Sequence, residues 1–380
     1  MAGRDPYYLL TPGPITTSAR TKQAMLHDWG SRDQEIIEAT RRIGDALLAI
    51  AGAEKDHVCI PMQGSGTFAV EAALGTLIPR EGPKGSKALV LINGAYGRRM
   101  AKILGVMGRP CATFETAEDT PPSAAEVDGI LGGDGEISHV LCVHCETTSG
   151  IANPLAEIAK VVADHKRSLI IDAMSSFGAL PLNASEVQFD AVVASSNKCL
   201  EGVPGIGFVI ARRSVMEAAA GNAHSLSLDL YEQWRAMEAN GQCGQWRFTP
   251  PTHVIKAFEA ALDQFDGEGG RAERYRRYAE NRDILISGMR EMGFETFLPD
   301  SSQAPIIVTF LMPADPNFDF DVFYDGLKTR GFVIYPGKLT GRQTFRMGCI
   351  GHLAAAEMNA AVEAVRDTIT AMGVKSGAAA

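Results

Sequence analysis

The feature of this chain that most limits its possible folds is an alternation of short apolar runs with amphipathic stretches. The apolar runs predict strands at residues 57–61, 88–93, 139–144, 169–172, 191–195 and 207–211. Stretches with helical spacing, such as residues 68–78 and 155–165, separate several of these strands. Strands that are apolar throughout are buried on both faces, so the pattern predicts a mostly parallel sheet between two layers of helices.

The pattern changes after Thr249. We expect one long helical stretch over residues 253–292, in which the segment ERYRRYAENR is interpreted as a solvent-exposed face. Beyond it the sequence predicts a strand, a helix, two strands and a last helix, at residues 306–311, 320–329, 332–335, 345–349 and from Ala354. The final eight residues are expected to form a frayed tail.

Together these elements predict an α/β fold with two domains. The large domain, residues 19–270, is expected to hold the mostly parallel sheet, and the C-terminal domain, residues 271–380, to be a smaller α+β unit. Residues 1–18 are expected to pack on the small domain and the active site. A cleft between two such domains is a common place for a ligand.

The composition argues against several other classes of protein. The 380 residues are 46% hydrophobic, and the formal net charge of −9 argues against nucleic-acid binding, which needs a basic surface. No apolar run approaches a membrane span and no signal peptide is recognisable, so we expect a cytoplasmic protein. Seven scattered cysteines suit reduced thiols. Cys142 and Cys145 lack the further ligands of a closed zinc site, so no metal is expected.

A glycine-rich loop follows the first predicted strand and opens a predicted helix. The backbone N–H groups and hydroxyls of Ser65, Gly66 and Thr67 would form a cradle for a phosphate. The same loop matches the dinucleotide fingerprint, but that fingerprint needs an acidic residue where the next strand ends, and this chain has Asn93 there. The mismatch argues against nicotinamide binding and leaves a phosphate cradle or a plain helix start.

Three more residues follow predicted strands and together indicate a cofactor. Asp172 ends a strand, where α/β sheets bind ligands, although it could instead cap a helix. Lys198 follows another strand, and partial burial would lower its pKa and favour an amine nucleophile over a surface lysine. Tyr96 could cover a flat ring or pack in the core. An anion cradle, an acid and a reactive lysine are what pyridoxal phosphate requires.

Nine segments of the chain resemble those of the class V aminotransferases, which are pyridoxal-phosphate enzymes of fold-type I. In order they are LLTPGPITTS, DWGSRDQE, MQGSGTFAVEAAL, NGAYGRR, HCETTSG, DAMSSFGA, SSNKCLEGVPG, RFTPPTH and YPGKLTGRQTFRMGCIGH. The resemblance extends from about Leu9 to Met372. It is most specific to members that transfer the amino group of 2-aminoethylphosphonate to pyruvate. It therefore implies a homodimeric, cytoplasmic enzyme of phosphonate degradation that forms phosphonoacetaldehyde and L-alanine.

The resemblance also implies roles for individual residues. Lys198 would carry the Schiff base and move the proton, and Asp172 would pair with the pyridinium nitrogen. Further cofactor contacts would come from Ser65, Gly66, Thr67, Tyr96, Thr147 and, toward the neighbouring subunit's cofactor phosphate, Thr249. Arg346 would bind the anionic end of the substrate, because a guanidinium binds carboxylate or phosphonate bidentately. Lys338, Arg342 and Arg20 could add positive charge, or could be ordinary surface residues, and the loop at residues 11–14 could close over the site.

Three alternative functions remain open at this point. Another class V aminotransferase, of the alanine–glyoxylate or serine–glyoxylate type, would share the cofactor core and differ only in its anion pocket. A lyase of the cysteine desulfurase kind needs a reactive cysteine on a mobile loop, and neither Cys199 nor Cys349 fits that position. A protein that binds the cofactor without turnover is the third alternative, and the intact Lys198, Asp172 and Arg346 argue against it.

Overall fold

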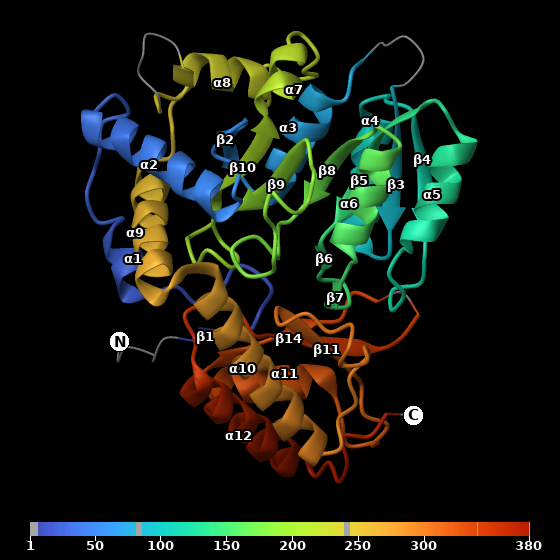
Figure 1. Ribbon diagram of the computed structural model, residues 1–380. Helices are drawn as coiled ribbons and strands as arrows, with labels where there is room; N and C mark the ends of the chain where they lie inside the picture. Colours follow the sequence, from blue (N-terminus) through green and yellow to red (C-terminus); the bar gives the residue numbers. More distant parts are fainter. Residues whose placement is uncertain (1–6, 81–85, 239–243, 340, 380) are drawn as a thin grey trace.

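The computed structural model describes residues 7–80, 86–238, 244–339 and 341–379. Its largest sheet has seven strands in the order β2-β10-β9-β8-β5-β3-β4 (Figure 1). Their bounds are His57–Gly64, Gly205–Arg212, Ala191–Ser195, Ser168–Asp172, Ile137–Val143, Lys87–Ile92 and Cys111–Glu115. Strand β10 runs antiparallel to both of its neighbours, and the other pairs are parallel. The predicted mostly parallel sheet is therefore confirmed.

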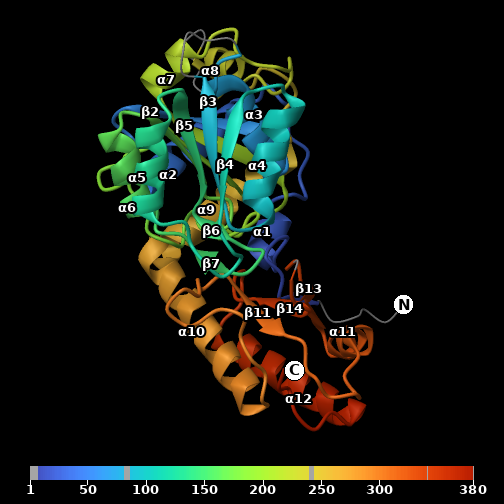
Figure 2. The same cartoon turned by 90° about the vertical axis from the view of Figure 1, so that its right-hand side faces the viewer.

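Two hydrophobic cores cover the two faces of this sheet. One core packs the sheet against α2 (Gln34–Ile50), α5 (Ala124–Gly133), α6 (Leu155–Asp164) and α9 (Thr252–Glu268). The other packs it against α3 (Gly66–Leu77), α4 (Ala95–Val106), α7 (Arg213–Ala218) and α8 (Leu230–Glu238). Figure 2 shows α5 and α6 on one side of the sheet and α3 and α4 on the other. Strand β3 serves both cores, since Leu89 and Leu91 face one and Val90 faces the other.

A smaller antiparallel sheet lies in the C-terminal part of the chain. Its strands are β11 (Ile307–Leu311), β14 (Thr344–Gly348) and β13 (Tyr335–Pro336), in that order. A third core, rich in phenylalanine, joins it to α10 (Gly270–Glu291), α11 (Phe320–Thr329) and α12 (Ala355–Met372). The N-terminal strand β1 (Tyr8–Leu9) pairs with β12 (Phe332–Val333) beside this core. Residues 1–6 of the expected N-terminal segment lie outside the described residues.

The remaining short elements are α1 (Ala19–Gln23), β6 (Cys145–Glu146) and β7 (Ile151–Ala152). Strand β4 was not predicted, because it lies at the edge of the large sheet and its side chains are only partly buried. The predicted strand at residues 332–335 is two short strands, β12 and β13, in different sheets. These differences arise where an element is too short or too exposed to give a clear apolar pattern.

Three predictions for the C-terminal half are wrong, wholly or in part. The single helix over residues 253–292 is two helices, because Gly269 adopts a left-handed φ of 109° that ends α9. The segment ERYRRYAENR is solvated on one side only, where Tyr275, Arg276 and Glu280 are exposed. On its other side Arg274, Tyr278 and Asn281 are buried. The described part of the expected tail, residues 373–379, is not frayed. Val374 is buried, and the N–H of Gly377 donates to the Met292 carbonyl at 2.9 Å.

Candidate active site

The predicted site residues gather where the parallel strands end. Asp172 is the last residue of β8, and Lys198 follows β9 in the next loop. Tyr96 begins the helix after β3, and the loop after β2 supplies the glycine-rich segment. A cavity of about 190 Å³ is lined by Ser65, Gly66, Thr67, Tyr96, Asp172 and Lys198. Six of the nine predicted residues thus share one cavity, and Thr147, Thr249 and Arg346 do not line it.

The glycine-rich loop begins α3 in a conformation suited to an anion. Ser65 has an extended backbone and makes no side-chain cap, so the first N–H groups of this helix face the cavity without a cap from Ser65. A Cβ at Gly66 would lie 2.2 Å from the sulfur of Met174, so a larger residue here would have to displace that side chain. Arg99, which sequence reasoning missed, donates to the Thr67 hydroxyl at 3.1 Å and adds a positive charge beside the loop.

Asp172 and Lys198 are both removed from water. Burial raises the pKa of the Asp172 carboxyl, against the opposing effects of the Met174 N–H, Lys198 and Arg99. Burial lowers the pKa of the Lys198 amine, against the opposing effects of Tyr96, Cys199 and Asp172. The Lys198 ammonium donates to the Pro12 carbonyl at 2.7 Å. The N-terminal loop at residues 11–14 therefore lies directly against the lysine.

Tyr96 lies between two cations. The Arg99 guanidinium is 4.8 Å from its ring centroid, and the Lys338 Nζ is 5.5 Å from it. Burial would raise the pKa of this phenol, but Lys198, then Thr147, Lys338 and Arg99, lower it overall. Of the three additional basic residues, Lys338 therefore lies at the site.

The other two basic residues do not share that position. Arg20 instead forms an exposed ion pair with Asp263 at 2.7 Å, and Arg342 is exposed. For Arg20, the competing interpretation of ordinary surface charge is therefore the right one.

Arg346 is a buried cation that no described carboxylate neutralises. It is 1% exposed on the central strand of the small sheet. Its Nη1 donates to the Thr147 carbonyl at 2.8 Å and its Nε to the Pro336 carbonyl at 3.1 Å. Burial lowers the pKa of this guanidinium, while Tyr96, Tyr335 and Glu146 oppose the shift. Glu146 acts on the guanidinium, but no described carboxylate lies within ion-pair distance of it, and a buried charge without a direct partner favours an anionic ligand.

Sequence reasoning also missed Glu146, which joins Tyr96 to the Arg346 side of the site. Its fully buried carboxylate accepts the N–H of Tyr96 at 3.2 Å and the hydroxyl of Thr148 at 2.6 Å. Burial raises the pKa of this carboxyl, against the opposing effects of the Thr148 hydroxyl and N–H and the Tyr96 N–H. The next residue, Thr147, offers its carbonyl to Arg346. The signal was a glutamate three positions after the apolar strand β5, at the end of the short strand β6.

Two further positions bear on which cofactor the site fits. The hydroxyl of Ser195, which lines the cavity, is buried and has no hydrogen-bond partner among the described residues. Asn93, where a nicotinamide site needs an acid, donates to the Asn153 side chain at 2.7 Å.

Among the residues that the structure describes, no cluster of three or more His, Cys, Asp or Glu side chains could hold a metal ion. No helix of that same part is long and apolar enough to cross a membrane.

Thr249 is exposed, and the neighbouring Phe248 is 51% exposed. Its side chain does not line the cavity that holds Lys198. Its predicted contact to a neighbouring subunit stays a prediction.

Comparisons with known proteins agree with this geometry. A family profile described as aminotransferase class-V matches residues 18–321. A curated 2-aminoethylphosphonate–pyruvate transaminase from Pseudomonas fluorescens is 57% identical over 96% of this chain and 97% of its own.

Two solved structures share the fold at low sequence identity. Ureidoglycine–glyoxylate aminotransferase from Bacillus subtilis has a TM-score of 0.88 at 20% identity, covering 98% of this chain and 95% of its own. Pyridoxamine–pyruvate aminotransferase from Mesorhizobium loti has a TM-score of 0.86 at 22% identity, covering 99% and 96%. The fold of the chain is that of these aminotransferases, and the chain belongs to the class V aminotransferase family.

Proposed function

We propose that this protein transfers the amino group of 2-aminoethylphosphonate to pyruvate, forming phosphonoacetaldehyde and L-alanine. A curated relative with that printed name is 57% identical over nearly the whole chain. The structural observation that carries the proposal is Arg346, a buried guanidinium without a carboxylate partner among the described residues. One such group can bind the phosphonate of the donor and then the carboxylate of the acceptor, because both present oxygens to the guanidinium fork.

The cavity residues fit pyridoxal phosphate. Ser65, Gly66 and Thr67 would hold the phosphate at the start of α3, and Tyr96 would cover the ring. Asp172 would face the pyridine nitrogen, and its raised pKa suits a carboxyl that shares a proton with that nitrogen. When bound, the cofactor accepts the electrons left on the substrate carbon after its proton is removed.

The chain's own groups then control the proton and the substrate. Lys198 is the base, because its lowered pKa leaves more of the amine unprotonated near neutral pH. Arg346 holds the anionic end of the substrate, so that the carbon to be deprotonated lies within reach of the amine. Glu146 fixes the start of α4 and therefore the orientation of Tyr96. Positioning of this kind can contribute several kcal/mol to catalysis.

Two alternatives are less well supported. A cysteine desulfurase needs an accessible thiolate, but Cys199 and Cys349 are buried and burial raises the pKa of each thiol to about 12. A glyoxylate-type class V aminotransferase would keep the same lysine, acid and arginine. The identity to the phosphonate-named relative favours the first proposal over it.

We further propose a cytoplasmic homodimer in which Thr249 reaches the partner's cofactor phosphate. Phe248 beside Thr249 and Phe68 beside Thr67 are each 51% exposed, which places apolar surface next to both halves of such a contact. We also propose domain boundaries at residues 18 and 270. The glycine break at Gly269 and the separate C-terminal core support the second boundary.

The test is the visible absorption of the cofactor-loaded protein before and after adding 2-aminoethylphosphonate without pyruvate. We expect the band to fall with this donor, and to return with pyruvate as alanine appears. Equimolar alanine and serine, each with glyoxylate, serve as competing pairs. A response to those pairs but not to 2-aminoethylphosphonate would reject the proposed donor and keep the class V assignment.

A further inference from the structure

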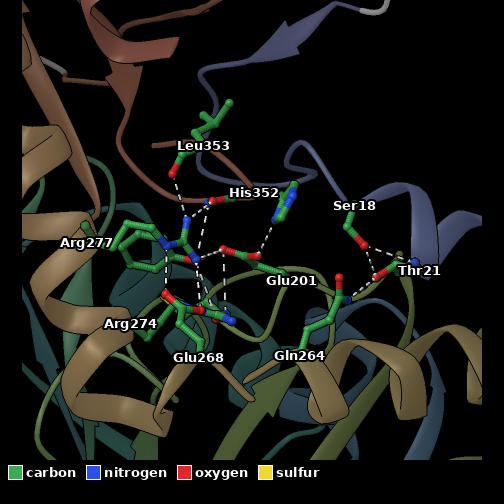
Figure 3. Close-up of polar contacts among 12 residues, drawn as sticks. Ser18, Thr21, Glu201, Gln264, Glu268, Arg274, Arg277, His352 and Leu353 are labelled. Carbon is green, nitrogen blue, oxygen red and sulfur yellow. Dashed lines mark hydrogen bonds and ion pairs between the residues drawn. The ribbon is translucent and has the colours of Figure 1, made fainter. Parts of the chain in front are cut away.

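A buried ionic network lies beside the loop that carries Lys198. It contains the carboxylates of Glu201 and Glu268 and the guanidinium groups of Arg274 and Arg277, which Figure 3 labels. The phenol of Tyr278 belongs to it as well. The Arg277 Nη2 lies 2.7 Å from Glu201 Oε1, and the Tyr278 hydroxyl donates to the same oxygen at 2.6 Å. Glu201 is 4% exposed and Arg274 is 1% exposed. Nothing in the proposed reaction requires charges at this position.

The network joins three separate parts of the fold. Arg274 Nη1 donates to the Cys199 carbonyl, which belongs to the residue directly after Lys198. Arg277 Nη1 donates to the carbonyls of Gly351 and Leu353, at 2.7 and 2.8 Å, in the loop that follows β14. Both arginines lie in the first part of α10, the helix that runs from the large sheet toward the small one in Figure 1. The same side chains thus hold the lysine loop and the loop after the Arg346 strand.

Glu201 has a backbone conformation that needs support. Its φ is 57°, in the left-handed region that glutamate seldom adopts. Its N–H donates to the Lys198 carbonyl at 2.9 Å, which closes a tight turn directly after the lysine. The Gly202 N–H then donates to the Ser196 carbonyl at 2.8 Å and closes the loop on its other side. The contacts of the carboxylate hold this turn in place.

We infer that Glu201 is a positioning residue that sets the location of the Lys198 amine relative to Arg346. Two residues separate Lys198 from Glu201, and four separate Arg346 from Gly351, so each functional side chain lies close in sequence to one end of the network. The inference rests on the proposed function only in treating Lys198 as the base and Arg346 as the anion anchor.

Glu201 stays ionised at the pH at which the enzyme would be assayed. Burial would raise the pKa of this carboxyl, but His352, Arg274, Arg277 and Tyr278 together lower it to about 2. The carboxylate therefore keeps both guanidinium groups in place throughout the pH range in which an aminotransferase would be assayed.

The test compares Glu201→Gln with Glu268→Gln in the cofactor-loaded enzyme. Glu268 is the matched control, because it binds the same two arginines, through Arg274 Nε and Arg277 Nε at 2.7 Å each, but has no hydrogen bond to the lysine turn. We expect Glu201→Gln to lower kcat about 10- to 100-fold with a change in KM below about 3-fold. We expect Glu268→Gln to keep kcat within about 3-fold while losing comparable thermal stability.

A second readout needs no amine donor, so it stays informative even if 2-aminoethylphosphonate is not the substrate. The visible absorption of the loaded enzyme is titrated with pH, which reports on the environment of Lys198. We expect Glu201→Gln to move the midpoint down by about half a pH unit, and Glu268→Gln to leave it nearly unchanged. Equal effects of the two variants on kcat and midpoint would overturn the inference and leave a purely structural network.

If Glu201→Gln does not accumulate as folded protein, Tyr278→Phe replaces it. This change keeps every charge and removes the hydroxyl that donates to Glu201 at 2.6 Å. The same hydroxyl lies 3.5 Å from the Cys199 carbonyl and accepts the Gly351 N–H at 3.3 Å, so these two weaker contacts are lost with it. We expect a fall in kcat of about 3-fold with the same downward movement of the midpoint. Wild-type kcat and midpoint in Tyr278→Phe would contradict the inference.

Discussion

The active site and the network at Glu201 both contain a buried carboxyl and a buried guanidinium, but the pKa shifts of these groups have opposite directions in the two regions. In the network, His352, Arg274 and Arg277 lower the pKa of the Glu201 carboxyl against the effect of burial. Glu268 and Glu201 likewise raise the pKa of the Arg277 guanidinium. Burial instead dominates at Asp172 in the cavity, where it raises the pKa of the carboxyl, and at Arg346 outside the cavity, where it lowers the pKa of the guanidinium. The paired charges of the network stabilise the fold, whereas Asp172 and Arg346 have no direct ion-pair partner among the described residues and are suited to bind a ligand.

The largest effect is expected for the lysine of the cavity. Lys198→Ala removes the base and the covalent attachment, so amino transfer should fall by about 10⁴-fold or more. The unfolding midpoint of the cofactor-free protein should change little, because within the described part of the chain the Lys198 amine donates a single hydrogen bond, to the Pro12 carbonyl. Steady-state kinetics checks the loss of amino transfer, and thermal unfolding of the same preparation checks the unfolding midpoint. Residual transfer above about 1% of wild type would contradict the role of Lys198.

The contribution of Glu201 to the free energy of unfolding should instead be lost at acidic pH. The folded pKa of Glu201 is about 2, below its ordinary 4.5, so its contribution to stability is present above pH 4.5 and is lost as pH falls toward 2. That contribution is roughly 3 kcal/mol. Urea unfolding of wild type and Glu201→Gln at pH 6 and pH 3 checks the sign. The difference between them should be large at pH 6 and smaller at pH 3, and a constant difference would contradict it.

The smallest effect on stability is expected for Asp172, the cavity carboxyl that has no direct ion-pair partner in the described part of the chain. The folded pKa of Asp172 is raised, so its favourable contribution belongs to the protonated form and is lost as pH rises through that pKa. Asp172→Asn avoids this cost and can still accept the Met174 N–H. We expect the cofactor-free variant to melt about 1–3 °C higher than wild type at pH 7, and to bind the cofactor more weakly. A lower melting temperature would show that Asp172 is paired after all.

The same contrast explains what sequence could and could not predict. Lys198 and Asp172 were predicted because they directly follow apolar strands, and the ends of parallel strands meet at one edge of a sheet. Glu201 was missed because its partners lie more than 70 residues away, on a helix that reads as charged on all sides. Composition shows that a helix is rich in Arg and Glu, but not which of these charges the small sheet buries.

Turn geometry was the other feature that could not be predicted from the sequence. The break at Gly269 depends on a positive φ, and a glycine pair inside a charged stretch does not specify it. The C-terminal residues carry few apolar side chains, yet backbone hydrogen bonds to Met292 and Ala314 hold them. The seven-stranded core was predictable because burial on both faces leaves a clear apolar pattern in every central strand.

The most direct test of the contrast is one pair of variants, Arg346→Gln and Arg277→Gln, measured for unfolding free energy without cofactor and for amino transfer with it. Arg277→Gln leaves two carboxylates short of a partner and should lose about 3–5 kcal/mol. Arg346→Gln should lose less than about 1 kcal/mol, or gain stability, while kcat/KM falls about 10²- to 10³-fold for both substrates. If Arg346→Gln instead destabilises the protein as much as Arg277→Gln and leaves kcat/KM intact, the buried arginine is structural and the account is wrong.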